Sequence, residues 1–231
     1  MLLPEPAATL AATFPNRNDL ALAYLKGQLL DGGLEPGQVF STEDVAQRLR
    51  ISRAPATDAI KRLARDGFIA VAPQVGCRVR TPKPAEVADF YRLFARSEAL
   101  ITGFAAARRT ESQASSFQAL TSSLTQRVRD ARNRENPGPK LRSLNRERYE
   151  AIHALANSQI AGELVSNMWD RSDFYVRVAC GTFVLPRAAQ SASTKISKAI
   201  VAGDADTASG ETESYLSAIG EQTAARLRSQ S

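Results

Sequence analysis

Basic side chains are concentrated in one short stretch of this 231-residue sequence. Between Arg48 and Arg80 there are eight arginine or lysine residues and two aspartates, which gives a local charge of +6. The whole chain also carries +6, so the remainder is electrically balanced. A local field of this kind attracts a polyanion, and the commonest polyanion in the cytoplasm is nucleic acid. The alternative interpretation is a solvated helix face without a partner.

Groups that could catalyse a reaction are scarce. His153 is the only histidine, and the two cysteines, Cys77 and Cys180, lie far apart in the sequence. These residues cannot form a zinc cluster, a neighbouring Cys–His pair or a disulfide framework. The sequence also has no phosphate-binding glycine loop and no adjacent nucleophile and base. We therefore expect a protein that is not an enzyme, binds no metal and uses no cofactor.

Apolar runs are short throughout the sequence. Charged residues or prolines interrupt each run well before the length that a membrane span requires. The first six residues contain no lysine or arginine, which a secretion signal would need. The sequence therefore predicts a cytoplasmic protein with no membrane partner.

Two short helices and a hairpin, which follow a longer amphipathic helix, would position the basic stretch. A first amphipathic helix is expected from an N-cap at Asp19 to Gly32. A capping box that begins at Ser41 predicts a second helix through Leu49, and Ser52 caps a third after a tight connection. Two short helices across such a joint indicate a helix-turn-helix. The β-type runs at 68–72 and 77–80, around a turn at 73–76, predict a wing.

Two prolines, Pro82 and Pro84, mark a domain boundary because they interrupt both strands and helices. The predicted organisation is a flexible arm at 1–16, a winged helix-turn-helix domain at 17–81, a linker at 82–84 and a second domain at 85–231. Everything after the linker has helical periodicity, which predicts an antiparallel helical bundle. The expected fold is therefore mainly α. The expected bundle helices are 85–109, 112–134, 140–156, 160 to about 184, 188–202 and 204–228.

The segment from Ser52 to Ile69 resembles the recognition helix and first wing strand of GntR-type regulators. Further residues fall at the offsets expected for this family, namely Leu29, Gly33, Pro36-Gly37 and the helix from Ser41 to Leu49. In the second domain, the segments 90–98 and 202–205 are similar to the FadR-type (FCD) effector domain. The resemblance covers residues 20–228. It implies a transcriptional regulator that binds an operator in double-stranded DNA as a homodimer and responds to a small molecule.

The resemblance also implies which residues contact DNA. Arg53 matches the principal base-contacting arginine, whose two-pronged guanidinium suits guanine O6 and N7, although a phosphate contact is the alternative. Thr57 and Glu43 depart from the pattern, since the family often has basic residues at both positions, and the preferred base sequence should differ accordingly. The complete predicted set is Ser41, Thr42, Ser52, Arg53, Ala54, Thr57, Lys61, Arg62, Gln74 and Gly76.

Many FadR-type effector domains hold a metal with one aspartate and three histidines, and an arginine binds the carboxylate of the ligand. In this chain Asn145 stands in place of the aspartate, and Phe94 in place of the arginine. The three histidines are replaced by Tyr149, Ser193 and Tyr215, so no metal is expected. With Glu98, these residues would line a pocket for a neutral or weakly polar effector. The alternative is that the aromatic side chains fill the pocket.

Other possible anion-binding residues are Arg96, Arg148 and Arg177, each of which also fits an exposed helix face.

The resulting hypothesis is a DNA-binding transcriptional regulator, with repression as the expected mode. Two other hypotheses remain at this point. One is a DNA-binding protein that works without an effector. The other is an enzyme that uses the basic domain to dock on nucleic acid.

Overall fold

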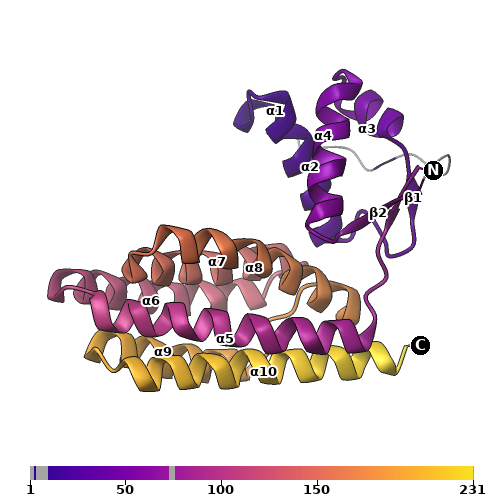
Figure 1. Cartoon of the computed structure of the whole chain (residues 1–231). Coiled ribbons are helices and arrows are strands. Elements are labelled where there is room, and N and C mark those ends of the chain that lie inside the picture. The colour runs from indigo at the N-terminus through magenta and orange to yellow at the C-terminus, as the bar shows by residue number, and fades with distance from the viewer. Residues whose placement is uncertain (1–2, 4–9, 73–75, 231) are drawn as a thin grey trace. The chain divides into compact units, whose positions relative to one another are not determined.

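The computed structural model describes residues 3, 10–72 and 76–230, and it divides into two compact units, Met1–Pro82 and Lys83–Ser231 (Figure 1). The second unit begins with a helix that includes Pro84, which was predicted to belong to the linker. Pro84 is the first residue of this helix, where proline is favourable because its missing N–H would have no intrahelical partner.

The first unit contains the short helix α1 (Leu10–Thr13) followed by α2 (Arg17–Asp31), α3 (Thr42–Leu49) and α4 (Arg53–Arg65). Helix α1 lies in a segment predicted to be a flexible arm, and Leu3 in the same segment is buried. Helix α2 starts earlier than predicted. Asn16 is its N-cap, because the Asn16 side chain accepts a hydrogen bond from the Asn18 amide, and Asp19 lies in the first turn instead.

Local signals explain how α3 and α4 are joined. Ser41 Oγ accepts from the Asp44 amide at 3.1 Å, and Asp44 Oδ2 accepts from the Ser41 amide at 2.7 Å, so the predicted capping box is present. Arg50 ends α3 in the left-handed region, with φ of 54°, and α4 begins three residues later. The structure therefore has the helix-turn-helix that the sequence predicts.

In the part of this unit that the structure describes, three antiparallel strands form a sheet in the order β1 (Val39–Phe40), β3 (Gly76–Val79) and β2 (Ile69–Ala72). Strands β2 and β3 form the predicted hairpin. Strand β1 was not predicted, because two residues are too few to show an alternating pattern and its partner, β3, is remote in sequence. Gly76 has φ of 101°, and a Cβ there would lie 2.9 Å from Phe40 O, so this glycine permits the contact between β3 and β1.

The second unit is a helical bundle, as predicted. Its helices in the described residues are α5 (Pro84–Arg108), α6 (Glu111–Arg132), α7 (Gly138–Ala156), α8 (Gln159–Cys180), α9 (Ala188–Ala202) and α10 (Ala205–Arg228). Helices α5 and α10 lie side by side over most of their length (Figure 1). Helix α8 ends four residues before the predicted position, because Gly181 adopts a left-handed C-cap with φ of 77°. No helix among the described residues is both long and apolar enough to cross a membrane.

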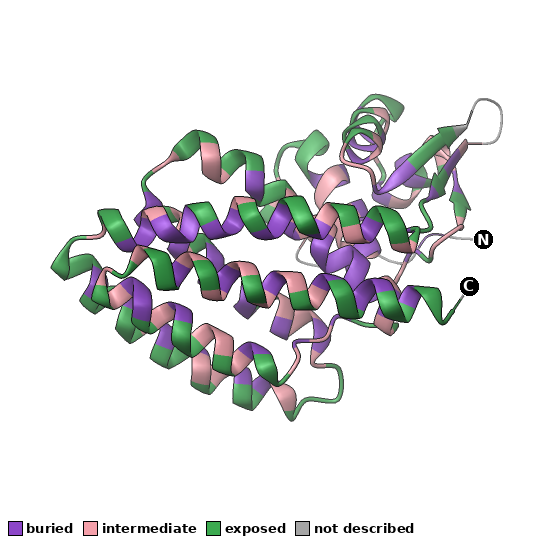
Figure 2. Cartoon of the chain, turned by 60° about the horizontal axis from the view of Figure 1, so that its bottom comes forward, coloured by how far each residue is buried: buried purple, intermediate pink, exposed green. Residues whose placement is uncertain are grey.

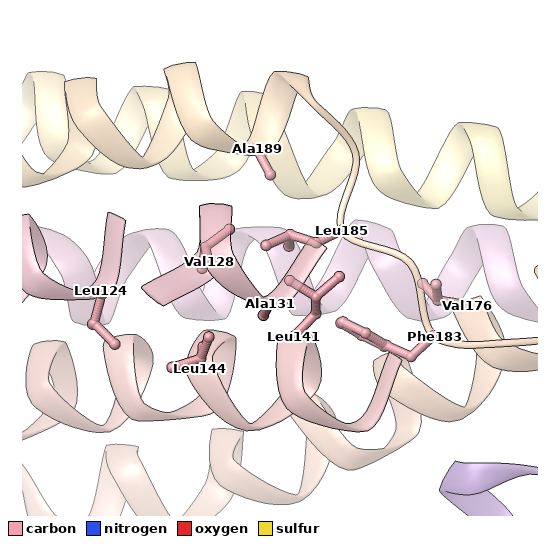
Figure 3. Packing of buried hydrophobic residues seen from close by; sticks show 9 residues of the cluster. All are labelled: Leu124, Val128, Ala131, Leu141, Leu144, Val176, Phe183, Leu185 and Ala189. Carbon is pink, nitrogen blue, oxygen red and sulfur yellow. The ribbon is translucent and has the colours of Figure 1, made fainter. Parts of the chain in front are cut away.

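Each bundle helix has one buried and one exposed face, which is the cause of its periodic sequence (Figure 2). One part of the core joins α6 and α7 to the segment between α8 and α9 (Figure 3). There, Leu124 and Val128 of α6 and Leu144 of α7 belong to one core cluster, to which the segment between α8 and α9 contributes Phe183 and Leu185. The burial of these side chains fixes the relative positions of α6, α7 and α9, which also line a cavity described below.

Candidate nucleic-acid interface and ligand cavities

The N-terminus of α4 is open to solvent. Ser52, its N-cap, makes no capping hydrogen bond with its side chain, and Ser52, Arg53 and Ala54 are all exposed. The opposite side of the helix is anchored in the core by Ala59, Leu63 and neighbouring buried residues. The first amides of a helix have no intrahelical partner and carry the positive end of its dipole, so this end can receive an anion such as a phosphate.

Arg53 is held by an acidic partner from the other helix of the motif. Its Nε donates to the Glu43 carboxylate of α3, and the two side chains are 76% and 42% exposed. Thr57 Oγ1 donates to the Arg53 carbonyl at 2.9 Å, one turn along α4. The guanidinium predicted to read a base is therefore paired with a carboxylate from the other helix of the motif.

The remaining predicted contacts on the helices have different surroundings. Ser41 uses its hydroxyl for the capping box of α3, and Thr42 is the half-buried first residue of that helix. Lys61 and Arg62 are exposed along α4, two turns and more from its N-terminus. Arg62 Nη1 lies 3.9 Å from Asp19 Oδ1 of α2. The exposed face of α4 thus carries the cations Lys61 and Arg62 on the C-terminal side of Ser52, Arg53 and Ala54.

The structure says less about the predicted DNA contacts of the wing. Gln74 lies outside the described residues. Gly76 is needed for the approach of β3 to β1, which is a structural role independent of DNA. In β3, Arg78 is exposed, and its Nη1 donates to the Gly37 carbonyl at 3.1 Å.

In the second unit, Trp169 of α8 contacts three of the predicted effector residues, Phe94, Glu98 and Tyr149. The ring centroid of Trp169 lies 3.8 Å from that of Tyr149 and 4.9 Å from that of Phe94. Trp169 Nε1 donates to Glu98 at 3.0 Å, and His153 Nε2 lies 2.9 Å from the same carboxylate. Phe94, Glu98 and Tyr149 are all buried, so packing and hydrogen bonds within the protein occupy this part of the pocket.

The other three predicted effector residues line two separate cavities. Asn145 and Tyr215 line a first cavity of about 240 Å³. Ser193 lines a second cavity of about 310 Å³, together with Arg148. The predicted residues therefore line more than one cavity. No local sequence pattern indicates these contacts of Trp169, because they join α8 to α5 and α7.

Asp173 is an unexpected acid at the first cavity. This side chain is buried, and burial raises the pKa of its carboxyl to about 7, although nearby Arg146 and Arg142 act to lower it. Arg146 Nη2 lies 3.6 Å from Asp173 Oδ2. The first cavity thus has largely apolar walls and one carboxyl group, that of Asp173, whose pKa is raised.

The four residues that the resemblance places at metal-binding positions have side chains that suit a metal poorly. They supply an amide (Asn145), two phenols (Tyr149 and Tyr215) and a hydroxyl (Ser193), all poor ligands at neutral pH. Burial raises the pKa of both phenols further, which disfavours the anionic form that would bind a cation. Across residues 10–72 and 76–230, no group of three or more histidine, cysteine, aspartate or glutamate side chains is arranged to hold a metal ion.

Comparison with known proteins agrees with this architecture. The chain matches the model for bacterial regulatory proteins of the gntR family over residues 19–79, and the FCD domain model over residues 89–218. Its fold is similar to that of Escherichia coli McbR/YncC, with a TM-score of 0.69 at 22% identity, covering 93% of this chain and 98% of that one. A GntR family member from Pseudomonas syringae pv. tomato has a TM-score of 0.51 at 16% identity, with 98% and 90% covered.

A curated relative from Streptomyces ambofaciens is 35% identical over 74 residues. It is described as an HTH-type transcriptional regulator in an unstable DNA locus. The match spans 32% of this chain and 31% of the relative, so this chain covers about a third of the length of that protein. The two domain matches, by contrast, extend over most of the sequence. The chain belongs to the GntR family of bacterial transcriptional regulators and carries an FCD domain of the FadR type behind its DNA-binding domain.

Proposed function

We propose that this regulator represses transcription by binding operator DNA as a homodimer, with α4 as the recognition helix and a small molecule as its effector. The observation that carries the proposal is the open N-terminus of α4, where Ser52, Arg53 and Ala54 are exposed at the end of a helix-turn-helix. In this motif the N-terminal residues of the second helix contact base edges in the major groove.

The side chains at this surface are suited to different kinds of contact with DNA. Arg53 has the planar fork that pairs with guanine O6 and N7, and the α4 amides favour a phosphate. Thr57, one turn along, would lie beside the base that Arg53 reads. Lys61 and Arg62 lie further along the helix, where a contact to the phosphate backbone is expected.

Homodimerisation follows from the proposed mechanism, because a symmetric operator requires two recognition helices. Helix α5 offers a surface for this contact. Leu93 and Leu100 are seven residues apart and therefore share a face, and they are 62% and 56% exposed. Large apolar side chains in such a row are typical of a surface that another protein covers.

DNA selected from a random pool by the full chain would test the DNA-binding part of the proposal. We expect a two-fold symmetric site, with binding weakened by about 1 to 3 kcal/mol in Arg53→Ala. Arg129→Ala, which removes an exposed arginine from α6, is the matched control and should bind like the wild type. Equal binding by Arg53→Ala and the wild type would refute the assignment of α4.

Sedimentation of the full chain would test the dimer. The wild type is expected to sediment as a dimer, and the double variant Leu93→Asp/Leu100→Asp as a folded monomer with weaker operator binding. Exposed Leu164 on α8 provides the control, since Leu164→Asp should leave the mass unchanged. A monomeric wild type that still protects both halves of a symmetric site would contradict this part.

A further inference from the structure

Three side chains form a hydrogen-bonded chain across the helix-turn-helix. Gln47 Nε2 donates to Glu43 Oε1 at 3.4 Å, and Arg53 Nε donates to Glu43 Oε2. Gln47 and Glu43 belong to α3, and Arg53 is the first residue of α4. Both oxygens of the Glu43 carboxylate therefore have a donor, one from each helix of the motif.

Arg53 is free to exchange this carboxylate for another acceptor. Among the described residues, Glu43 is the one acidic partner of Arg53, and the bond uses only Nε of the guanidinium. The Arg53 side chain is 76% exposed, so it can turn away from Glu43 while both helices stay in place. When Arg53 leaves, the Glu43 carboxylate keeps the hydrogen bond from Gln47.

A carboxylate and a guanine offer a guanidinium the same kind of partner. Guanine presents two neighbouring acceptors, O6 and N7, in the major groove, and a carboxylate presents two oxygens. Adenine presents an acceptor and a donor there, so it does not match the guanidinium fork. In the free protein Glu43 therefore occupies Arg53 as a guanine would.

We propose that Glu43 is a specificity-determining residue that relaxes the preference for guanine at the base pair that Arg53 reads. The proposal rests on the function proposed above, in which α4 is the recognition helix. With guanine in register, Arg53 exchanges Glu43 for O6 and N7, and the lost ion pair offsets part of the gain. With another base in register, Arg53 stays with Glu43 instead of becoming an unsatisfied donor in the groove. Both effects bring the affinities for different sites closer together.

The size of the effect is limited by the strength of the ion pair. The side chains of Arg53 and Glu43 are both partly exposed, so the pair changes the relative affinity of two sites by about two- to threefold. A change of this size does not abolish the preference for guanine. It allows the protein to bind a broader set of operators that differ at this base pair.

Selection from a random DNA pool by three full-length proteins would test the proposal. Arg53→Ala identifies the base pair whose preference depends on Arg53, because guanine should no longer be enriched there. At the same position the wild type should enrich guanine moderately, and Glu43→Gln should enrich it more strongly. Equal or weaker enrichment by Glu43→Gln would overturn the proposal.

Fluorescence anisotropy at constant salt then measures the preference on defined sites. One duplex carries guanine at this position, a second carries 7-deazaguanine, which lacks only the N7 acceptor, and a third carries adenine. The ratio of the Kd values for the altered and the guanine sites should be about two- to threefold larger in Glu43→Gln than in the wild type. In an Arg53→Ala background, Glu43→Gln should leave this ratio unchanged. The same increase in that background would overturn the proposal, because Glu43 would then act without Arg53.

Asp19→Asn is the matched control for the removal of a negative charge. Asp19 lies in α2 of the same unit, its side chain is 53% exposed, and its Oδ1 is 3.9 Å from Arg62 Nη1. The control should strengthen binding to all three duplexes alike, because a general charge effect does not depend on the base. If Asp19→Asn raised the ratio as much as Glu43→Gln, charge alone would account for the result and the proposal would be overturned.

A second substitution and the wild type keep the proposal separable from the function on which it rests. Glu43→Ala leaves no acceptor for Arg53 and should raise the ratio at least as much as Glu43→Gln. Weaker operator binding by Arg53→Ala, together with an unchanged ratio in both Glu43 variants, would overturn this inference alone. Operator binding by Arg53→Ala equal to that of the wild type would refute the role of α4 and this inference with it.

Discussion

Arg53 at the start of α4 is paired with Glu43 of α3, so the side chain proposed to read a base is bound to a carboxylate in the free protein. DNA must displace this carboxylate or accommodate it beside the phosphates. Both side chains are partly exposed, and such a pair contributes only about 0.2 to 1 kcal/mol. The pair therefore moderates the affinity for DNA without preventing binding.

Glu43→Gln should tighten operator binding by about two- to fivefold at moderate salt, since it frees Arg53 and removes a negative charge near DNA. Fluorescence anisotropy with the selected operator would measure the change. In an Arg53→Ala background the same substitution should gain less, because the ion pair no longer exists. Equal gains in both backgrounds would show that Glu43 acts on DNA without involving Arg53.

Glu98→Leu should lower the free energy of unfolding by about 1 to 3 kcal/mol, because Trp169 Nε1 and His153 Nε2 would lose their buried acceptor. Glu98→Gln keeps an acceptor oxygen and should cost less. Urea unfolding followed by Trp169 fluorescence measures both, since the chain has one tryptophan. If Glu98→Leu were as stable as the wild type, the carboxylate would not organise this centre.

The fold was largely predictable because its main signals are local. The capping box of Ser41 and Asp44, the N-cap at Ser52 and the helical periodicity after Pro84 each depend on residues close in sequence. Strand β1 escaped prediction because Phe40 pairs with remote Cys77. The end of α8 was predicted about four residues too late, because Gly181 adopts the left-handed conformation that ends the helix.

The effector site was less predictable because it depends on packing between remote helices. Alignment of single positions placed Phe94 and Tyr149 around one pocket, but it could not show that Trp169 of α8 fills the space between them. Arg148 was equally compatible with an exposed helix face, and only the neighbouring helices reveal its burial. Periodicity identifies a helix face but does not identify which helix covers it.

Asp173→Asn should make the stability of the protein less dependent on pH. The pKa of Asp173 is raised by burial to about 7, compared with about 3.9 in an unfolded chain. The folded state therefore retains a proton that the unfolded state loses, and this stabilisation is complete below about pH 3.9 and is lost as the pH rises through about 7. Asparagine resembles the protonated carboxyl and should remove this component.

Urea unfolding between pH 5 and 8 would measure the difference between the wild type and Asp173→Asn. The slope attributable to Asp173 is at most about 1.4 kcal/mol per pH unit. Asp89→Asn is the control, because the Asp89 side chain is 75% exposed, and it should keep the pH dependence of the wild type. A parallel decline in all three proteins would show that Asp173 is ionised throughout this range.

Gly220→Ala and Gly210→Ala should have opposite effects, although both lie inside α10. A Cβ at Gly220 would lie 2.4 Å from Tyr91 Cβ of α5, and the Tyr91 hydroxyl is anchored 2.8 Å from Ser172 Oγ, so the ring cannot move aside freely. The overpacked variant should lose about 1 to 3 kcal/mol of stability. Nothing lies within 4 Å of a Cβ at Gly210, where alanine should gain about 0.5 to 1 kcal/mol from its better helix propensity. Thermal unfolding compares the two, and an equal gain at Gly220 would contradict the close approach of α5 and α10.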